Sequence, residues 1–270
     1  MKAFINHFAF EFKTGIRDKN LLLLNYLFPL GFYVLISILM SNINPVFVET
    51  LIPAMILISV LASTLLGLPD PYVKMREAGI FRSYKVNGVP ASSIVIIPPL
   101  TIILHMIVVS IIIVSTASVF FDAPLPLNWI KFLLVFILTL FASTGLGILI
   151  GVASANTRAT VLWAQLFFLP SMMIGGFFIP SQMLPQAIKK VSMLLPVTHS
   201  FNLFKYFSYQ QFLGYDPLWS MLILFTGGIL AFGLAIFLFN WDNKNNTRKG
   251  HPALAFLVLI PYILGAIFLS

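Results

Sequence analysis

Residues 73–93 read VKMREAGIFRSYKVNGVPASS, a charged stretch between two long apolar runs. Its charged side chains are Lys74, Arg76, Glu77, Arg82 and Lys85. The stretch predicts a polar helix over about residues 73–90, because such a density of charge does not lie in a bilayer core and the Gly-Val-Pro sequence at its end favours a turn. A polar helix between two membrane spans indicates a docking surface for a protein outside the membrane.

Composition places most of the chain in lipid. The 270 residues are 59% hydrophobic and 9% charged, whereas a soluble domain has about 25% charged residues. The apolar runs are continuous, which favours helices over a β-barrel. No cysteine is present, so disulfides and thiol chemistry contribute nothing. The net charge of +8 lies in the connections beside the apolar runs, which favours anionic lipid over nucleic acid as its partner.

Apolar runs of about 20 residues can cross a bilayer as helices. The predicted spans are residues 21–40, 50–69, 94–120, 127–151, 160–179, 217–240 and 252–269. Six of them form one transmembrane domain over residues 21–240. A basic linker, residues 241–251, then leads to an extra C-terminal helix over residues 252–270, which is shorter and interrupted by Pro261. The expected fold class is an all-α membrane protein.

The distribution of basic residues sets the orientation. Twelve of the sixteen lysines and arginines fall on the side of the N-terminus: Lys2, Lys13, Arg17, Lys19, Lys74, Arg76, Arg82, Lys85, Arg158, Lys244, Arg248 and Lys249. The opposite side has Lys131, Lys189, Lys190 and Lys205. This bias predicts a multi-pass protein with a cytoplasmic N-terminus.

Residues 1–20 show a helical period before the first span. Phe4, Ile5, Phe8, Phe12 and Ile16 share one face, and Lys2, Asn6, Lys13 and Arg17 lie opposite. The pattern predicts an amphipathic helix in the plane of the lipid headgroups. The alternative is a basic leader that only sets the topology.

The segment before the sixth span is too long for a plain connection. It contains GGFFIPSQMLP from Gly175 and LPVTHSFN from Leu195. Its prolines interrupt helices and fix turns, which predicts a re-entrant helical hairpin over residues 177–215. Such a hairpin could close the outer end of a path, or it could be a cap that only packs the bundle.

Small residues are dense over residues 142–151, which read ASTGLGILIG. Gly147 and Gly151 form a G-x-x-x-G pair, which lets helix backbones approach closely. In a chain with several spans this favours packing between its own helices over a dimer interface.

Sequence motifs for catalysis are missing. The chain has no phosphate-binding G-x-x-x-x-G-K-[ST] loop, no dinucleotide fingerprint and no H-E-x-x-H. Its four histidines lack metal-ligand spacing, and its eight acidic residues are mostly in loops. We therefore expect no enzymatic activity, and no cofactor or metal bound by this chain.

Charged residues are also missing from the middle of the spans. Their absence argues against a proton-coupled or sodium-coupled carrier and against a channel with a charged ring. His105 and Gln165 are the main polar side chains within the spans. We expect His105 to be hydrogen-bonded to a neighbouring helix rather than to relay protons.

Together these features resemble the permease subunits of ABC-2 type ATP-binding-cassette exporters, of the kind that confer drug or antibiotic resistance. The resemblance covers essentially residues 1–240. It rests on the N-terminal helix, the six-span order, R-E-x-G-x-F-R-S-Y-K-V-N-G-V-P from Arg76, and G-G-F-F-I-P followed by L-P from Gly175. Ile80 stands where the family often has threonine.

The resemblance implies a six-helix bundle whose polar segment is a coupling helix that docks on a separate ABC ATPase, which binds the ATP and magnesium. The coupling interface would comprise Arg76, Glu77, Gly79, Ile80, Phe81, Arg82 and Tyr84, with Gly79 allowing close approach and Pro90 ending the helix. The extracellular gate would comprise Gly175, Gly176, Phe177, Phe178, Pro180, Pro185 and Pro196. A second permease copy or a related permease would complete a dimer in the cell membrane.

The expected function is export of a hydrophobic or amphipathic molecule, such as a drug, an antibiotic or a lipid-like compound, by alternating access. Export of a polysaccharide or glycolipid is the alternative within the family. An ATPase-independent carrier would show paired repeats or broken helices, and no repeat of three plus three spans is evident. A membrane-embedded enzyme of lipid metabolism would need convergent acidic or histidine residues, and Asp70 with Glu77 is too little.

Overall fold

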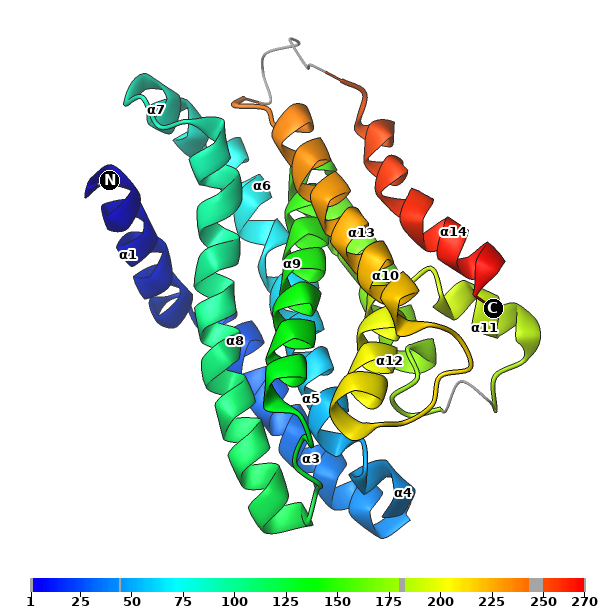
Figure 1. Ribbon diagram of the computed structural model, residues 1–270. Helices are drawn as coiled ribbons and strands as arrows, with labels where there is room; N and C mark the ends of the chain where they lie inside the picture. Colours follow the sequence, from blue (N-terminus) through cyan, green and yellow to red (C-terminus); the bar gives the residue numbers. More distant parts are fainter. Residues whose placement is uncertain (1, 44, 180–182, 243–249, 270) are drawn as a thin grey trace.

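The structure is a computed structural model that describes residues 2–43, 45–179, 183–242 and 250–269. Over these residues the regular elements are helices, and they form an elongated bundle (Figure 1). One end of the bundle has α7 (Ile80–Val86) and the other has α4 (Pro45–Val48). We refer to them as the α7 end and the α4 end.

Five helices in the described residues are long and apolar enough to cross a membrane. They are Lys19–Ser41, Leu51–Glu77, Ala91–Phe121, Trp129–Ala153 and Pro217–Leu238. The last three are single helices, α8, α9 and α13. The first comprises α2 (Lys19–Leu22), η1 (Leu23–Leu27) and most of α3 (Phe28–Ile43), and the second comprises α5 (Leu51–Leu61), η2 (Ala62–Gly67) and α6 (Pro69–Glu77). The predicted all-α membrane fold is thus confirmed.

Two of the predicted spans are not among these five. The fifth is α10 (Thr157–Ile174), which is more polar because it contains Arg158 and Gln165, and which ends five residues before the predicted limit. The seventh is a 3-10 helix, η4 (Pro252–Leu259), followed by α14 (Ile260–Phe268), and together they are shorter than the five spans. Most of the predicted linker, residues 243–249, lies outside the described residues.

The second span forms the centre of the bundle. Every residue of α5 is buried, whereas only 22% of the first span is buried. Gly147 of α9 faces the Thr64 carbonyl of η2 so closely that a side chain would not fit, and a methyl group at Gly151 would lie 3.1 Å from the Pro69 carbonyl oxygen. The predicted role of this glycine pair in packing within the chain is confirmed.

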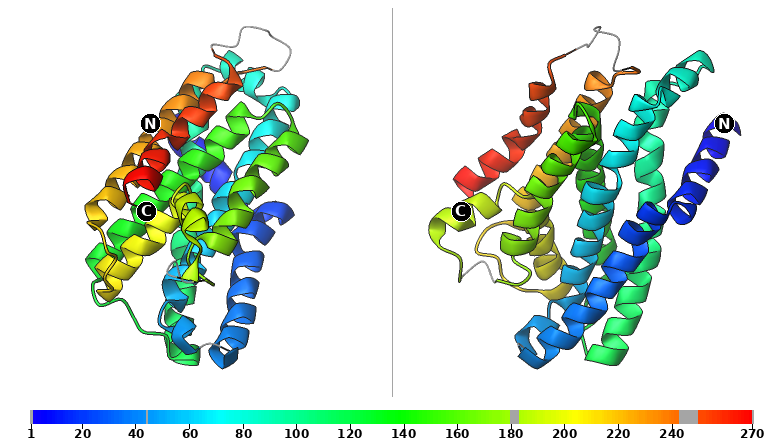
Figure 2. Two further views of the ribbon diagram at one scale, coloured as in Figure 1. Left: turned by 90° about the vertical axis from the view of Figure 1, so that its right-hand side faces the viewer. Right: turned by 180° about the vertical axis from the view of Figure 1, so that it is seen from behind.

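The N-terminal helix, α1 (Lys2–Arg17), packs against α8 at the α7 end (Figure 2). Its Phe12 ring stacks on His105 at 4.6 Å between centroids. The hydroxyl of Tyr26 on η1 lies 2.7 Å from His105 Nδ1. His105 is therefore hydrogen-bonded to a neighbouring helix, as predicted.

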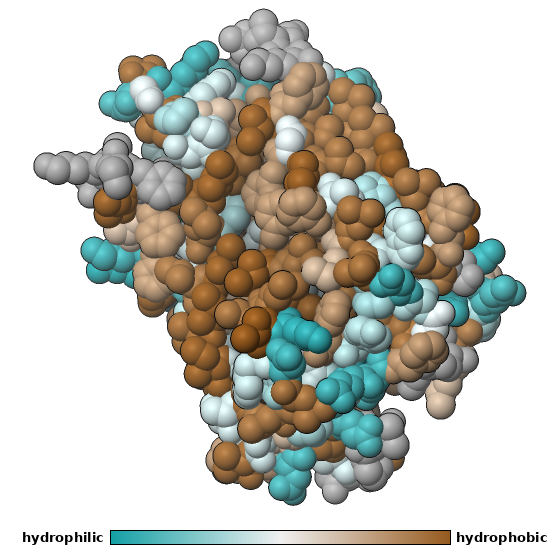
Figure 3. Space-filling view, in the orientation of Figure 1, coloured by the Kyte–Doolittle hydropathy of each residue, from teal (hydrophilic) through white to brown (hydrophobic). Residues whose placement is uncertain are grey.

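The surface over α8, α9 and α13 is apolar through the middle of the molecule (Figure 3). Exposed side chains there include Ile111 on α8, Leu133 on α9 and Phe225 on α13. An apolar band of this kind is what a hydrocarbon environment requires of a helical bundle.

Candidate functional site

The polar stretch of residues 73–90 starts within the second span and forms two helices at an elbow, where one helix was predicted. Its first part is α6, which continues the second span to Glu77. Gly79 then adopts φ +74° and starts α7, which ends at Val86. A left-handed residue in this turn favours glycine. No described atom of this chain lies within 4 Å of where a Gly79 side chain would start. Within the chain its role is therefore the turn, and its close approach to a docked partner stays a prediction. Pro90 directly precedes α8 and does not end α7.

Arg76 is predicted at the coupling interface, but its side chain is turned inward and is 5% exposed. Its Nη1 donates to the Val152 carbonyl at 2.9 Å, and its Nη2 donates to the Ser154 carbonyl. Both carbonyls lie at the C-terminus of α9, where carbonyl groups lack helical partners and have partial negative charge. The prediction of a surface role for Arg76 is therefore wrong: its side chain joins α6 to the end of α9 by hydrogen bonds.

Phe81 is also predicted at that interface, and it too lies inside. It is 1% exposed, and its ring lies 5.1 Å from that of Tyr72 on α6 and 5.4 Å from that of Phe239, which follows α13. Burial of an aromatic side chain contributes about 2–3 kcal/mol. Phe81 therefore anchors α7 to the bundle and does not offer a contact to a partner.

The exposed residues of the elbow include Glu77, Ile80 and Arg82 from the predicted interface, and we call these three residues the α7 face. Ile80 is 39% exposed, so the α7 face has one apolar side chain beside two exposed charged side chains. Arg82 forms an ion pair with Asp242, just beyond α13. Tyr84 is half-buried beside Phe81. The α7 face is thus exposed outward while Phe81 and Asp242 hold it to the end of α13.

The predicted hairpin begins where α10 ends, at the glycine pair. Gly176 adopts φ +97° and lets the chain turn back. Phe177 then packs on Phe201 at 5.2 Å between ring centroids, and Phe178 stacks on Phe47 at 5.9 Å. Both phenylalanines therefore fix the turn against the bundle.

Prolines mark the starts of the two hairpin helices. Pro185 precedes α11 (Gln186–Ser192), and Pro196 is the first residue of α12 (Pro196–Tyr209). Pro180 lies outside the described residues. Most of α12 is buried against α9, with the ring of Phe204 4.9 Å from that of Phe132. The hairpin is part of the packed bundle.

A buried polar network, which sequence reasoning missed, joins this hairpin to α13. His199 Nε2 lies 2.9 Å from the Met193 carbonyl, and its Nδ1 lies 3.0 Å from Ser220 Oγ. The Ser220 hydroxyl also bonds that of Tyr215, which accepts from Asn202. His199 lies within a predicted hairpin, and that position was the only signal in the sequence that it could be buried.

The chain was compared with known families and proteins. The ABC-2 type transporter family matches residues 3–209, from the N-terminal helix to the end of α12. The matched part includes the elbow and the hairpin, and it leaves out α13, η4 and α14. No curated protein matches at a significant level. The match covers well over half of the chain, which therefore belongs to the ABC-2 type transporter family.

Proposed function

We propose that this chain is the permease subunit of an ATP-driven exporter that moves a hydrophobic or amphipathic molecule out across the cell membrane. A separate ABC ATPase would bind ATP and magnesium and would dock on the α7 face. The N-terminus and the α7 end would lie in the cytoplasm. A second permease, identical or related, would complete the path, and the hairpin of residues 177–215 would form its outer gate.

One observation supports the coupling role most directly: the elbow that presents the α7 face contacts three spans. The α7 face continues the second span through α6, Arg76 bonds the end of α9, and Phe81 and Arg82 contact the residues after α13. A movement of a docked ATPase would therefore be passed to three spans together. Such a lever can bias the bundle between inward-open and outward-open states, provided that the ATPase binds them with different affinity.

The character of the cargo is inferred from the interior. Among the described residues, Arg76 is the one buried lysine, arginine or acid, and it lies at the α7 end. The other buried polar side chains are hydroxyl groups, amides and imidazoles. An interior so poor in charge suits an apolar or amphipathic cargo, because an ion or a highly charged solute would need compensating charges.

Alanine at Glu77 or at Arg82 tests the docking. Each change is expected to weaken binding of the co-purifying ATPase about tenfold, which corresponds to about 1.4 kcal/mol. Binding is measured by titration of the purified subunits, and ATP-dependent transport is measured in proteoliposomes. Lys190→Ala, an exposed change on the hairpin, is the control and should have no effect.

A second variant separates docking from folding of the elbow. Asp242→Asn removes the ion pair of Arg82 but leaves the α7 face complete, so it should bind the ATPase as the unchanged protein does. Full binding and transport by both alanine variants contradict the proposed docking. If Asp242→Asn and Arg82→Ala weaken ATPase binding equally, Arg82 acts by holding the elbow in place through its ion pair and does not contact the ATPase.

A further inference from the structure

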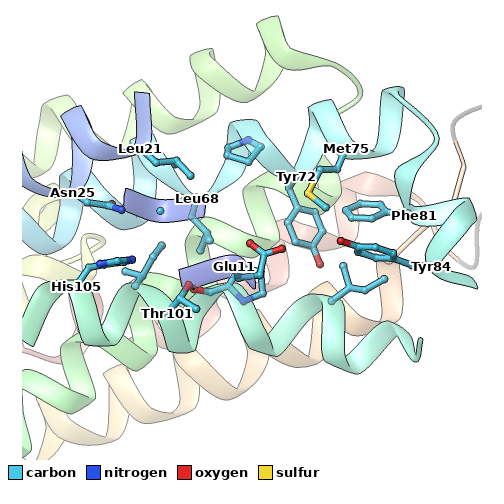
Figure 4. Close-up of a pocket in the computed structure, with 16 residues that line it drawn as sticks. Glu11, Leu21, Asn25, Leu68, Tyr72, Met75, Phe81, Tyr84, Thr101 and His105 are labelled. Carbon is cyan, nitrogen blue, oxygen red and sulfur yellow. Dashed lines mark hydrogen bonds between the residues drawn. The ribbon is translucent and has the colours of Figure 1, made fainter. Parts of the chain in front are cut away.

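Two cavities toward the α7 end differ in size and in the chemistry of their walls. The smaller, of about 50 Å³, lies among polar side chains such as Asn25, Thr101 and His105 (Figure 4) and has room for little more than water. The larger, of about 260 Å³, lies between the C-terminal half of α9, α10 and η4. In the described part of the chain, every residue that lines the larger cavity is apolar or aromatic except Ser154, whose hydroxyl is buried within the wall.

The apolar wall of the larger cavity determines what can fill it. Water does not fill such a space, because a water molecule needs at least two polar partners. An empty cavity is unfavourable too, since the atoms that line it lose their packing partners on one side. An apolar cavity of about 150 Å³ binds benzene, and in proportion a cavity of about 260 Å³ holds about ten carbon atoms. The occupant is therefore an apolar molecule or part of one.

The larger cavity is long and narrow. On α9 its wall extends from Leu146 to Ser154, which is about 12 Å along the helix axis. On η4 it extends from Pro252 to Leu259, which is about 14 Å in a 3-10 helix. A volume of about 260 Å³ spread over this length suits one extended chain rather than a compact ring system.

Two aromatic rings close one side of this cavity. Trp163 on α10 is 37% exposed and Phe256 on η4 is 52% exposed, although both also line the cavity. Their ring centroids lie 5.4 Å apart with 72° between the ring planes, an edge-to-face contact. The pair separates the cavity from the outside of the bundle. A side-chain rotation of either ring would open it sideways, which suits entry from a bilayer.

The helix η4 is unusually long for a 3-10 helix. It has eight residues, whereas runs longer than three or four are uncommon and often mark a hinge or a strained sequence. Side chains three residues apart lie above one another in this geometry. Two of the three resulting columns line the cavity: Pro252, Ala255 and Val258, and Ala253, Phe256 and Leu259.

The 3-10 geometry and the cavity depend on each other. In an α-helix, side chains three residues apart are offset by about 60°, so the two columns would turn away from the wall. Leu254, in the third column, is exposed and does not line the cavity. Strained backbone persists where the surrounding structure holds it in place, and it clusters at sites that clamp a ligand.

We propose that the larger cavity binds one unbranched alkyl chain of about ten carbons, which lies along α9 beneath η4. Such a chain fills the volume, needs no polar partner and supplies the packing that supports the 3-10 helix. The matched family region ends at residue 209, so the site includes a segment beyond that match. Binding needs neither an ATPase nor transport, and failure of the proposed export would leave it unchanged.

Photolabelling tests this site on the full permease, purified in digitonin, a steroid detergent that supplies no alkyl chain. The probe is decanol with a diazirine at the far end of its chain. Labelled peptides should come from α9, α10 and η4. Decanol should compete at least tenfold better than adamantanol, which has the same number of carbons in a compact cage.

Two neighbouring substitutions on η4 form a matched pair for this test. Ala255→Phe places a ring in the cavity and should reduce labelling of the three segments at least tenfold. Leu254→Phe adds the same ring on the exposed side of η4 and should label as the unchanged protein does. If Ala255→Phe does not fold, Ala255→Leu, a smaller addition at the same position, gives the same test.

Equal labelling of the Ala255 and Leu254 variants overturns the proposal, as does equal competition by decanol and adamantanol. Native mass spectrometry then identifies the source of the chain. A phospholipid that the unchanged protein retains and Ala255→Phe loses indicates an acyl chain of the membrane. Labelling of the three segments without a retained lipid indicates a free alkyl compound.

Discussion

Arg76→Ala is expected to lower the free energy of unfolding by about 3–4 kcal/mol. The change removes a buried guanidinium and leaves the Val152 and Ser154 carbonyls at the end of α9 without their donor. It also removes the positive charge that offsets the dipole of α9. The measurement is the unfolding midpoint in mixed micelles titrated with dodecyl sulfate.

Arg82→Ala is the matched control for this prediction. It removes the same side chain six residues further on, where the ion pair with Asp242 is 63% exposed on the arginine side, and exposed ion pairs contribute at most about 1 kcal/mol. Arg76→Lys keeps a charge but cannot reach both carbonyls in the same way, so it should fall between the two. Equal effects of the two alanine changes contradict the structural role given to Arg76.

Gly147→Ala is expected to cost about 3 kcal/mol. A methyl group at this position meets the Thr64 carbonyl on the backbone of η2. A backbone atom cannot rotate away as a side chain can, so α9 would have to move from the central span. Transport should fall as well, because the contact joins two of the spans that would move together under the proposed coupling. The same dodecyl sulfate titration measures the stability change.

Gly233→Ala, on the neighbouring helix α13, is the control and is not expected to lower the free energy of unfolding. Gly233 lies inside α13, and no atom of the described residues lies within 4 Å of the position its side chain would take. Because alanine favours a helix by about 1 kcal/mol over glycine, this variant should be as stable as the unchanged protein or more so. A Gly147→Ala protein of unchanged stability contradicts the close crossing of α9 and η2.

The spans could be predicted because length and continuous hydropathy determine them. Five of the seven predicted runs coincide with helices that satisfy both criteria. The two exceptions also have physical reasons: α10 contains Arg158 and Gln165, and Pro252–Phe268 is short and partly 3-10 in form. The role of the Gly147 and Gly151 pair followed from its spacing alone.

The residues of the elbow could not be assigned in the same way. Arg76 and Arg82 are both basic residues in one polar stretch, and only the tertiary contact with the end of α9, 76 residues away, distinguishes them. Phe81 lies in a charged stretch that is mostly exposed, and it is nevertheless buried against Phe239. The His199 network brings together residues from separate segments, and the sequence has no local signal for these contacts.

The most direct test of the proposed coupling uses the absence of cysteine from the chain. Glu77→Cys introduces a unique thiol on the α7 face, which is labelled with a photoreactive maleimide in native membranes and crosslinked. We predict a crosslinked partner, identified by mass spectrometry, that contains G-x-x-x-x-G-K-[ST]. Gln186→Cys, exposed on the hairpin, should not crosslink to it. If labelled Glu77→Cys captures no such chain, or if both positions capture it equally, the α7 face is not the docking surface.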